Sequence, residues 1–232
     1  MVKLNIEVLK EKVAIACNIM AAQGLADYLG HVSCRLPGEN SYLISPRASS
    51  LADVTAKDIV PVDSDGKVMS GTGKAPGELP IHLSIYASRP DVMSVTHTHS
   101  KFVTAFSIAR EKIMPVHHVG IPFIDGVPFL EDYGLVNNTA LADKIAKALG
   151  NKKAILLGNH GSVVVGRTVE EACVLTIWLE RNCELQFLSK GLGRIEPIPV
   201  DEAARALARH YLDGTAAGWN YYATLAKQRK GQ

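Results

Sequence analysis

Residues 154–165 read AILLGNHGSVVV and predict two short strands joined by a tight turn. The apolar runs 154–157 and 162–165 are typical of buried strands, and the four residues between them include two glycines and an asparagine. A second hairpin is expected upstream, where the turn formers of residues 63–66 separate two further β-rich runs. Both features favour antiparallel pairing, because strands joined by so few residues cannot lie parallel.

Helical patterns alternate with these strands along the chain. Strands are expected at 32–36, 42–45, 59–62, 67–69 and 92–97, and helices at 6–20, 78–88, from 100 onward, 141–149, 168–190 and 201–212. Hairpins outnumber strand–helix–strand crossovers, which favours an α/β fold with a mixed sheet covered by helices over an all-parallel sheet. The chain carries no internal repeat and no linker-like stretch, so one domain over residues 1–232 is expected.

Composition excludes several classes of protein. The chain has 232 residues, of which 47% are apolar and 21% charged, which excludes a disordered chain. No window approaches 18 uncharged apolar residues, so no membrane partner is expected. The formal net charge is +2 without a long basic block, and no nucleic-acid partner is expected either.

Two features indicate a cytoplasmic protein. The four cysteines lack Cys-x-x-Cys spacing and are expected to be reduced and buried. Near the N-terminus, Lys10, Glu11 and Lys12 interrupt any apolar signal core.

Histidines at the ends of predicted strands suggest a metal site. His97 and His99 are two residues apart, so in a strand that runs through His99 both imidazoles point to one side. His160 follows another apolar strand, and Glu78 begins a helix after a glycine-rich loop. Three imidazoles with a displaceable carboxylate suit a catalytic zinc or a similar divalent ion. Spacing alone leaves open that these are ordinary polar residues of strand ends, loops and a helix start.

Nucleotide and serine-hydrolase motifs are absent from the sequence. Residues 71–74 read GTGK, but the upstream glycine of a phosphate loop is missing, and Pro76 occupies the last glycine position of a dinucleotide motif. No Gly-x-Ser-x-Gly motif occurs. Nucleotide binding and serine-hydrolase activity are therefore not favoured.

These segments together resemble the class II aldolase/adducin family. The stretches that carry the resemblance are 30–35 (GHVSCR), 44–46 (ISP), 78–100, 156–161 (LLGNHG) and 179–180 (LE). The resemblance extends from the first helix to about residue 186. It implies a three-layer α/β/α sandwich on a mixed, largely antiparallel sheet, and a homotetramer with active sites at subunit interfaces. It also implies a divalent metal held by His97, His99 and His160, with Glu78 as the acid/base.

Such a site is suited to stabilising an enediolate. A metal chelated by two substrate oxygens withdraws charge while a neighbouring carbon–carbon bond breaks, and the fragment that leaves is an aldehyde or carbon dioxide. Glu78 would move one proton, a contribution of about 10²–10⁴-fold. The metal itself does not distinguish the two reactions.

The sequence departs from the sugar-phosphate members of the family where they bind phosphate. His31 replaces an asparagine, Arg47 follows Ser45 and Pro46, and residues 75–77 before the glutamate carry no hydroxyl. Arg47 and Lys74 offer cations instead, and arginine suits a planar carboxylate. With His31, they are the expected contacts of a small anionic substrate, unless both cations simply face solvent.

Residues 117–120 (HHVG) and 126–128 (GVP) are similar to the branch that decarboxylates hydroxylated aromatic or pyridine dicarboxylates. There His117 could protonate the ring carbon after carbon dioxide leaves, or it could pack at a subunit contact. His82, four residues after Glu78, could support the metal or pack the helix.

We therefore expect a divalent-metal-dependent carbon–carbon lyase, preferably a decarboxylase of a hydroxylated, aromatic or similar carboxylate. The alternative is an aldolase acting on a small hydroxy-carbonyl or sugar-phosphate substrate. An iron-dependent oxygenase and a non-catalytic adducin-like protein are less favoured. Zinc or manganese is the expected metal, and the ligand types also suit cobalt or iron.

Overall fold

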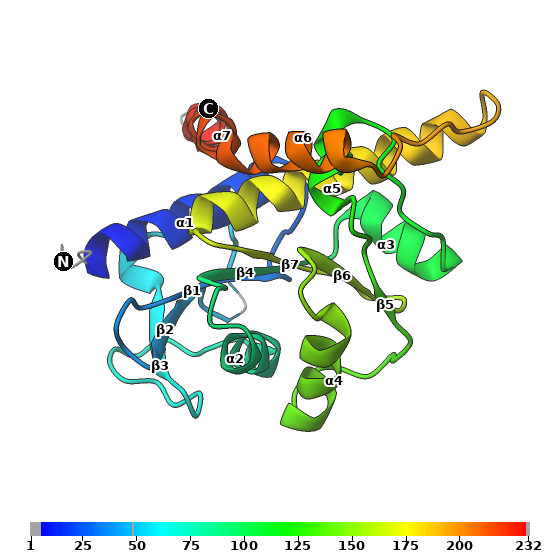
Figure 1. Ribbon diagram of the computed structural model, residues 1–232. Coiled ribbons are helices and arrows are strands. Elements are labelled where there is room, and N and C mark those ends of the chain that lie inside the picture. The colour runs from blue at the N-terminus through cyan, green and yellow to red at the C-terminus, as the bar shows by residue number, and fades with distance from the viewer. Residues whose placement is uncertain (1–5, 48, 231–232) are drawn as a thin grey trace.

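A seven-stranded sheet forms the middle of the molecule in the computed structural model, which describes residues 6–47 and 49–230 (Figure 1). The strand order is β3-β2-β1-β4-β7-β6-β5. The strands are β1 (His31–Arg35), β2 (Ser41–Ile44), β3 (Val60–Asp63), β4 (Ser94–Thr98), β5 (Phe129–Leu130), β6 (Ala154–Leu157) and β7 (Gly161–Gly166). Every neighbouring pair is antiparallel except β5 with β6. The expected mixed, largely antiparallel sheet is confirmed.

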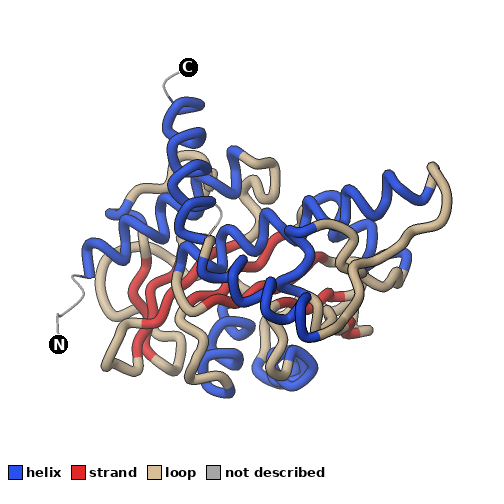
Figure 2. Tube along the Cα trace, turned by 45° about the horizontal axis from the view of Figure 1, so that its top comes forward, coloured by secondary structure: helices blue, strands red, loops and turns tan. Residues whose placement is uncertain are grey.

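Helices cover both faces of the sheet. Figure 1 shows α1, α5, α6 and α7 on one face and α2 and α4 on the other, and Figure 2 shows the strands in red between them. The helices are α1 (Ile6–Ala22), α2 (Leu79–Ser88), α3 (Lys101–Ala109), α4 (Thr139–Leu149), α5 (Val169–Lys190), α6 (Glu202–Asp213) and α7 (Thr215–Lys230), with 3-10 turns η1 (Ala56–Asp58) and η2 (His118–Phe123). The arrangement is the expected three-layer sandwich. Within the described ranges, none of these helices combines the length and apolarity that a membrane crossing needs.

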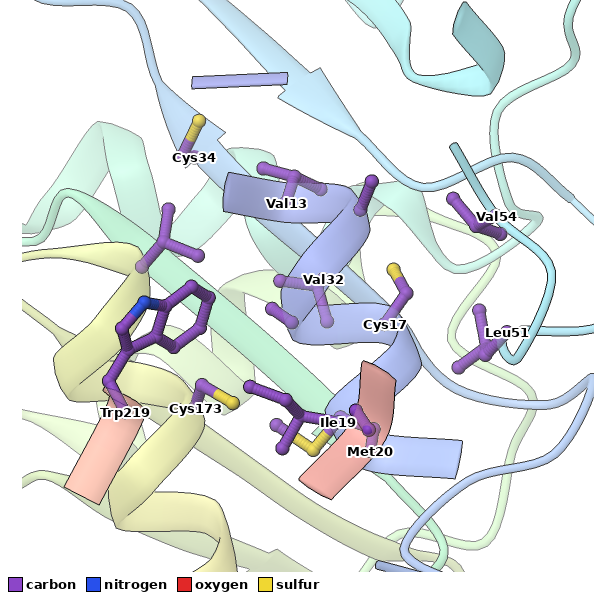
Figure 3. Close-up of a cluster of buried hydrophobic side chains, with 14 of the residues drawn as sticks. Val13, Cys17, Ile19, Met20, Val32, Cys34, Leu51, Val54, Cys173 and Trp219 are labelled. Carbon is purple, nitrogen blue, oxygen red and sulfur yellow. The ribbon is translucent and has the colours of Figure 1, made fainter. Parts of the chain in front are cut away.

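Two apolar layers hold the sandwich together. The one drawn in Figure 3 lies between α1, the sheet and α7, where Val13, Met20, Val32, Cys173 and Trp219 are buried. The other lies between the sheet and the α2–α4 pair. Because both faces of the central strands are covered, β4, β6 and β7 are buried along their whole length. Polar side chains at the ends of these strands are therefore held by a rigid frame.

Three local features differ from the pattern expected from the sequence. A further helix, α7, follows α6, and its Trp219 and Tyr222 pack within the chain against the α1 side of the core. Residues 67–69 form no strand: they contribute an isolated bridge between Val62 and Val68, next to which the Met69 N–H donates to the carbonyl oxygen of Pro61. Strand β4 ends at Thr98, so His99 is the first residue beyond it.

Candidate metal centre

Three separate segments bring Glu78 and three histidines together at one edge of the sheet. His97 is the next-to-last residue of β4, and His99 directly follows that strand. His160 lies in the β6–β7 turn, and Glu78 immediately precedes α2. Strands β4 and β7 are neighbours, with Thr98 opposite Ser162, so the β6–β7 turn lies beside the end of β4. The predicted convergence depends on this pairing.

The ligand atoms of the four residues lie within 4.8 Å of one another. The centroids of the three imidazole rings are 4.7–4.8 Å apart in every pairing. Glu78 Oε2 lies 3.3 Å from His97 Nε2, and Glu78 Oε1 lies 3.5 Å from His160 Nε2. One carboxylate thus faces several imidazole nitrogens across a space the size of a single ion.

The hydrogen bond that His97 makes through Nδ1 leaves its Nε2 able to bind a cation. His97 Nδ1 donates to the carbonyl oxygen of Ser162 at 3.0 Å, so in the neutral ring Nε2 carries a lone pair. That nitrogen lies 3.0 Å from His99 Nε2 and faces the Glu78 carboxylate. Nitrogen and oxygen donors of this kind are the ligands that zinc and similar divalent ions accept. The donor set therefore fits the metal that the sequence predicted.

Burial keeps the three imidazoles neutral at pH 7. Desolvation lowers the pKa of His97 and His160, and with the neighbouring imidazoles it lowers the pKa of His99 to about 3. Burial opposes the ionisation of Glu78, but hydrogen bonding from His31 and interactions with His97 and His160 outweigh it, and its pKa lies below the ordinary value. Neutral imidazoles beside a carboxylate are the protonation states that bind a metal.

Glu78 is also held from two other sides. The backbone N–H of Val136, in the loop between β5 and α4, donates to Glu78 Oε1 at 3.3 Å. His31, the first residue of β1, places Nε2 3.6 Å from Glu78 Oε2. His31 thus contacts the predicted acid/base residue, in addition to its predicted position near substrate.

Glu180 of α5 fixes the backbone next to His99, a role that the sequence did not reveal. Its carboxylate accepts hydrogen bonds from Ser100 Oγ and from the N–H groups of Phe102 and Val103 at the start of α3. A carboxylate at a helix N-terminus satisfies the free N–H groups and is stabilised by the helix dipole. Helix α3 and the residue before Ser100 are thereby anchored to α5.

The predicted substrate cations, Arg47 and Lys74, lie together in a cavity whose lining does not include the four residues of this cluster. Arg47 and Lys74 are both exposed, and both line a cavity of about 650 Å³ with Lys57 and Asp58. The N–H of Arg47 donates to the carbonyl oxygen of Lys74 at 2.8 Å, so the two loops are joined there. Two predicted anion contacts are therefore brought together.

His117 lies elsewhere in the described chain. Its Nδ1 accepts a hydrogen bond from the Val119 N–H at the start of η2, and its ring lies beside that of His118. Among the described residues it makes no contact with the histidine cluster. Its predicted role stays a prediction.

A family model described as the class II aldolase and adducin N-terminal domain matches residues 11–187. A 3,4-dihydroxyphthalate decarboxylase from Arthrobacter keyseri is 34% identical, over 90% of this chain and 95% of that protein. A 4-hydroxy-3-prenylphenylpyruvate oxygenase/4-hydroxy-3-prenylbenzoate synthase from Streptomyces roseochromogenus is 36% identical, over 81% of this chain and 70% of that protein. Among solved structures, an L-fuculose 1-phosphate aldolase from Glaciozyma antarctica aligns with a TM-score of 0.84 at 27% identity, covering 97% of this chain and 90% of that one.

Proposed function

The chain belongs to the class II aldolase and adducin family and is a lyase of that family, and we propose that it decarboxylates a hydroxylated, aromatic or similar carboxylate. The observation that carries this proposal is the convergence of Glu78 with His97, His99 and His160. The decarboxylase relative, which aligns over nearly its whole length, supports carbon dioxide rather than an aldehyde as the leaving fragment.

We assign the metal to His97, His99 and His160. A divalent cation bound there would stabilise the negative charge that the substrate acquires when its carbon–carbon bond breaks. Zinc or manganese is the metal we propose, and the imidazole donors would also accept cobalt or iron. The buried hydrogen bond from His97 to Ser162 orients one ring before any metal arrives.

Glu78 is the proposed acid/base residue. When the bond to the carboxyl group breaks, carbon dioxide leaves, the electron pair stays on the substrate carbon, and that carbon must take up a proton. A carboxylate at the edge of the cluster can accept a proton from a substrate hydroxyl at Oε1 or Oε2 and later return it to that hydroxyl oxygen, while a separate group supplies the proton to the carbon. The Val136 N–H donates to Oε1, and His31 Nε2 faces Oε2 at 3.6 Å, so both oxygens have a neighbour that favours their present position.

Arg47 and Lys74 are the proposed contacts for the substrate's carboxylate. They line one cavity, and their loops are joined by a backbone hydrogen bond. A guanidinium group can bind a carboxylate with two parallel hydrogen bonds, whereas the lysine supplies a mobile positive charge. This pair favours a small anionic substrate.

His117 is proposed as the proton donor to the substrate carbon. Because the described chain keeps it apart from the cluster, this role requires the homotetramer with interface active sites that the family resemblance implies. A His117→Ala variant that loses turnover while keeping both metal and tetramer would support the role. Unchanged turnover in that variant would remove His117 from the mechanism.

We also propose a cytoplasmic location, in keeping with the buried free thiols of Cys34, Cys173 and Cys183.

Two other reactions remain as second candidates. The likeness to an L-fuculose 1-phosphate aldolase favours aldol cleavage, and the prenylphenylpyruvate oxygenase relative favours an iron-dependent reaction with oxygen. Hydroxylated aromatic dicarboxylates and sugar phosphates should be assayed with the metal-loaded protein for carbon dioxide and for aldehyde, with and without oxygen. Anaerobic release of carbon dioxide supports our proposal. Aldehyde release from a sugar phosphate, or turnover that requires oxygen, would replace it with the corresponding alternative.

A further inference from the structure

A buried chain of hydrogen bonds runs from His31, which faces Glu78, into the interior of the α2 side of the molecule. His31 Nε2 faces Glu78 Oε2 at 3.6 Å, and His31 Nδ1 lies 2.7 Å from His82 Nε2. On the far side of that ring, His82 Nδ1 lies 2.6 Å from Ser33 Oγ, which lies 2.7 Å from the hydroxyl of Tyr86. Four side chains from β1 and α2 thus form one continuous row.

Water cannot complete the hydrogen bonding of this row. His82 is fully buried, Ser33 is 1% exposed and Tyr86 is 2% exposed. Tyr86 stacks on Tyr42, and the guanidinium of Arg35 lies over both rings. Each short contact must therefore have a hydrogen on one of its two atoms, since an unpaired buried polar group is costly.

The direction of the row follows from its Glu78 and Tyr86 ends. An ionised carboxylate only accepts hydrogen bonds, so a hydrogen on His31 Nε2 suits the Glu78 oxygen that faces it at 3.6 Å. If His31 Nδ1 also carried a hydrogen, His82 Nε2 would have to accept, and the whole row would run in the opposite direction, which the Tyr86 end disfavours. His31 Nδ1 is therefore an acceptor, and His82 Nε2 must donate to it.

The remaining contacts then have one consistent arrangement. Burial lowers the pKa of His82 well below its ordinary value, so the ring is neutral and its Nδ1 accepts. Ser33 donates to His82 Nδ1, and Tyr86 donates to Ser33. The opposite arrangement would have Ser33 donate to Tyr86, and the buried hydrogen of the Tyr86 hydroxyl would then have no acceptor among the described residues.

His31 is also the side chain best placed to donate to Glu78. His97 uses its one hydrogen on Ser162, and its Nε2 is a proposed metal ligand. The other described donor to the Glu78 carboxylate is the backbone N–H of Val136, which bonds Oε1. Donation to Oε2 thus falls to His31.

We propose that His82 is a positioning residue that locks His31 in the tautomer with hydrogen on Nε2, so that His31 presents a fixed donor to Glu78 Oε2. This inference rests on the proposed function, because it assigns a partner to the acid/base residue of that site. The sequence placed His31 near substrate and left His82 undecided, and the structure joins them. A fixed donor keeps one oxygen of Glu78 oriented while the other exchanges a proton.

The direct test is ¹⁵N NMR of histidine rings in the zinc-loaded wild-type protein, with His31 and His82 assigned from variants that lack each ring. We expect hydrogen on Nε2 and none on Nδ1 for both rings. Hydrogen on His31 Nδ1, alone or in addition to Nε2, would overturn the proposal. This measurement needs no substrate, so it is read independently of whether the protein is a decarboxylase.

Variants of His82 test the consequence for catalysis. His82→Leu removes the donor to His31, and we expect kcat to fall about 10- to 100-fold with KM and zinc content nearly unchanged. His82→Gln keeps an N–H donor and an oxygen acceptor and should recover most of the lost kcat. Ser84→Ala, which removes a hydrogen bond to Asp143 from the same helix, is the matched control and should retain activity.

Tyr86→Phe provides a milder variant if the His82→Leu protein does not fold. It removes only the last hydroxyl of the row, leaves Ser33 able to donate to His82, and should preserve the His31 tautomer. Suppose that His82→Leu and His82→Gln lose kcat to the same extent while the tautomer of His31 stays unchanged in both. His82 would then only pack helix α2. If wild-type protein shows the expected tautomers but no carbon dioxide release, the proposed reaction fails and the positioning role stands.

Discussion

A Cβ atom at Gly161 would lie 2.2 Å from the carbonyl oxygen of Thr98, so the turn that carries His160 packs directly on the strand end that precedes His99. The same atom would lie 3.0 Å from Cδ2 of the His99 ring. The preceding Asn159 has φ 54°, a left-handed conformation that asparagine tolerates. This close approach sets the spacing of two predicted metal ligands.

Gly161→Ala should therefore weaken metal binding as well as stability. The new methyl group must push the turn away from Thr98 and shift His160 relative to His99. We expect a loss of about 2–3 kcal/mol in the free energy of unfolding and reduced metal content after dialysis. Gly38→Ala is the control, since Gly38 has φ 79° in open space and should cost only about 1 kcal/mol of backbone strain. Equal metal content in both variants would contradict the close-packed turn.

Glu78→Gln should separate catalysis from metal binding. The amide keeps the size of the side chain but cannot take up a proton at pH 7, so turnover should fall by about 10²–10⁴-fold. Metal content, measured by mass spectrometry of the purified protein, should stay close to that of the wild type because three imidazoles remain. Glu11→Gln, an exposed carboxylate on α1, is the control for charge alone. Retained turnover in the Glu78 variant would show that another group moves the proton.

Arg47→Ala should raise KM with little change in kcat. A carboxylate contact made equally in the bound substrate and in the transition state contributes to binding only. Loss of one such contact corresponds to about a tenfold rise in KM, or about 1.4 kcal/mol. Lys67→Ala removes an equal charge from a nearby exposed turn outside the cavity and should leave KM unchanged. An unchanged KM in the arginine variant rules out the carboxylate contact.

The metal-free protein should lose stability as the pH falls below 6.5. The pKa of His97, His99 and His160 is lower in the folded protein than in the unfolded chain, so the unfolded chain binds protons first. The free energy of unfolding then declines by up to about 1.4 kcal/mol per pH unit for each such histidine, and for His99 the decline continues toward about pH 3. Urea unfolding between pH 7.5 and 5 measures this slope. His99→Ala should flatten it, and an equal slope in that variant would contradict the assignment.

Much of this architecture can be read from local sequence. The hairpin around His160, the end of α2 before Pro90 and the N-cap of α5 at Thr168 all depend on residues next to one another. The sheet order does not, because the pairing of β4 with β1 and β7 joins segments 60 or more residues apart. The family resemblance supplied what local patterns could not.

The elements that were missed had weak or unused signals. Helix α7 does show Trp219, Tyr222 and Ala226 at helical spacing, and all three are buried, so its pattern could have been found. Strand β5 has only two residues and pairs in parallel with β6, which no local periodicity reveals. Short edge elements of this kind are fixed by tertiary contacts.

Polar side chains inside helix α5 show that local sequence does not identify the partner of a buried side chain. Asn182 and Gln186 are buried and bond the backbone of Met114 and its neighbours, fixing the segment that leads to His117. Their spacing of four residues places them on one face, but nothing local identifies the partner. The pairing of His31 with His82 is hidden in the same way, since 51 positions separate the two rings.

The central claim is that His97, His99 and His160 hold one divalent cation beside Glu78. Metal analysis of the purified protein, combined with X-ray absorption at the edge of the metal found, measures both the stoichiometry and the ligand atoms. We predict one divalent ion per chain with three imidazole nitrogens bound, and no bound ion in His99→Ala. A wild-type protein that takes up no zinc, manganese, cobalt or iron, or that binds the ion without imidazole nitrogen, would contradict the account.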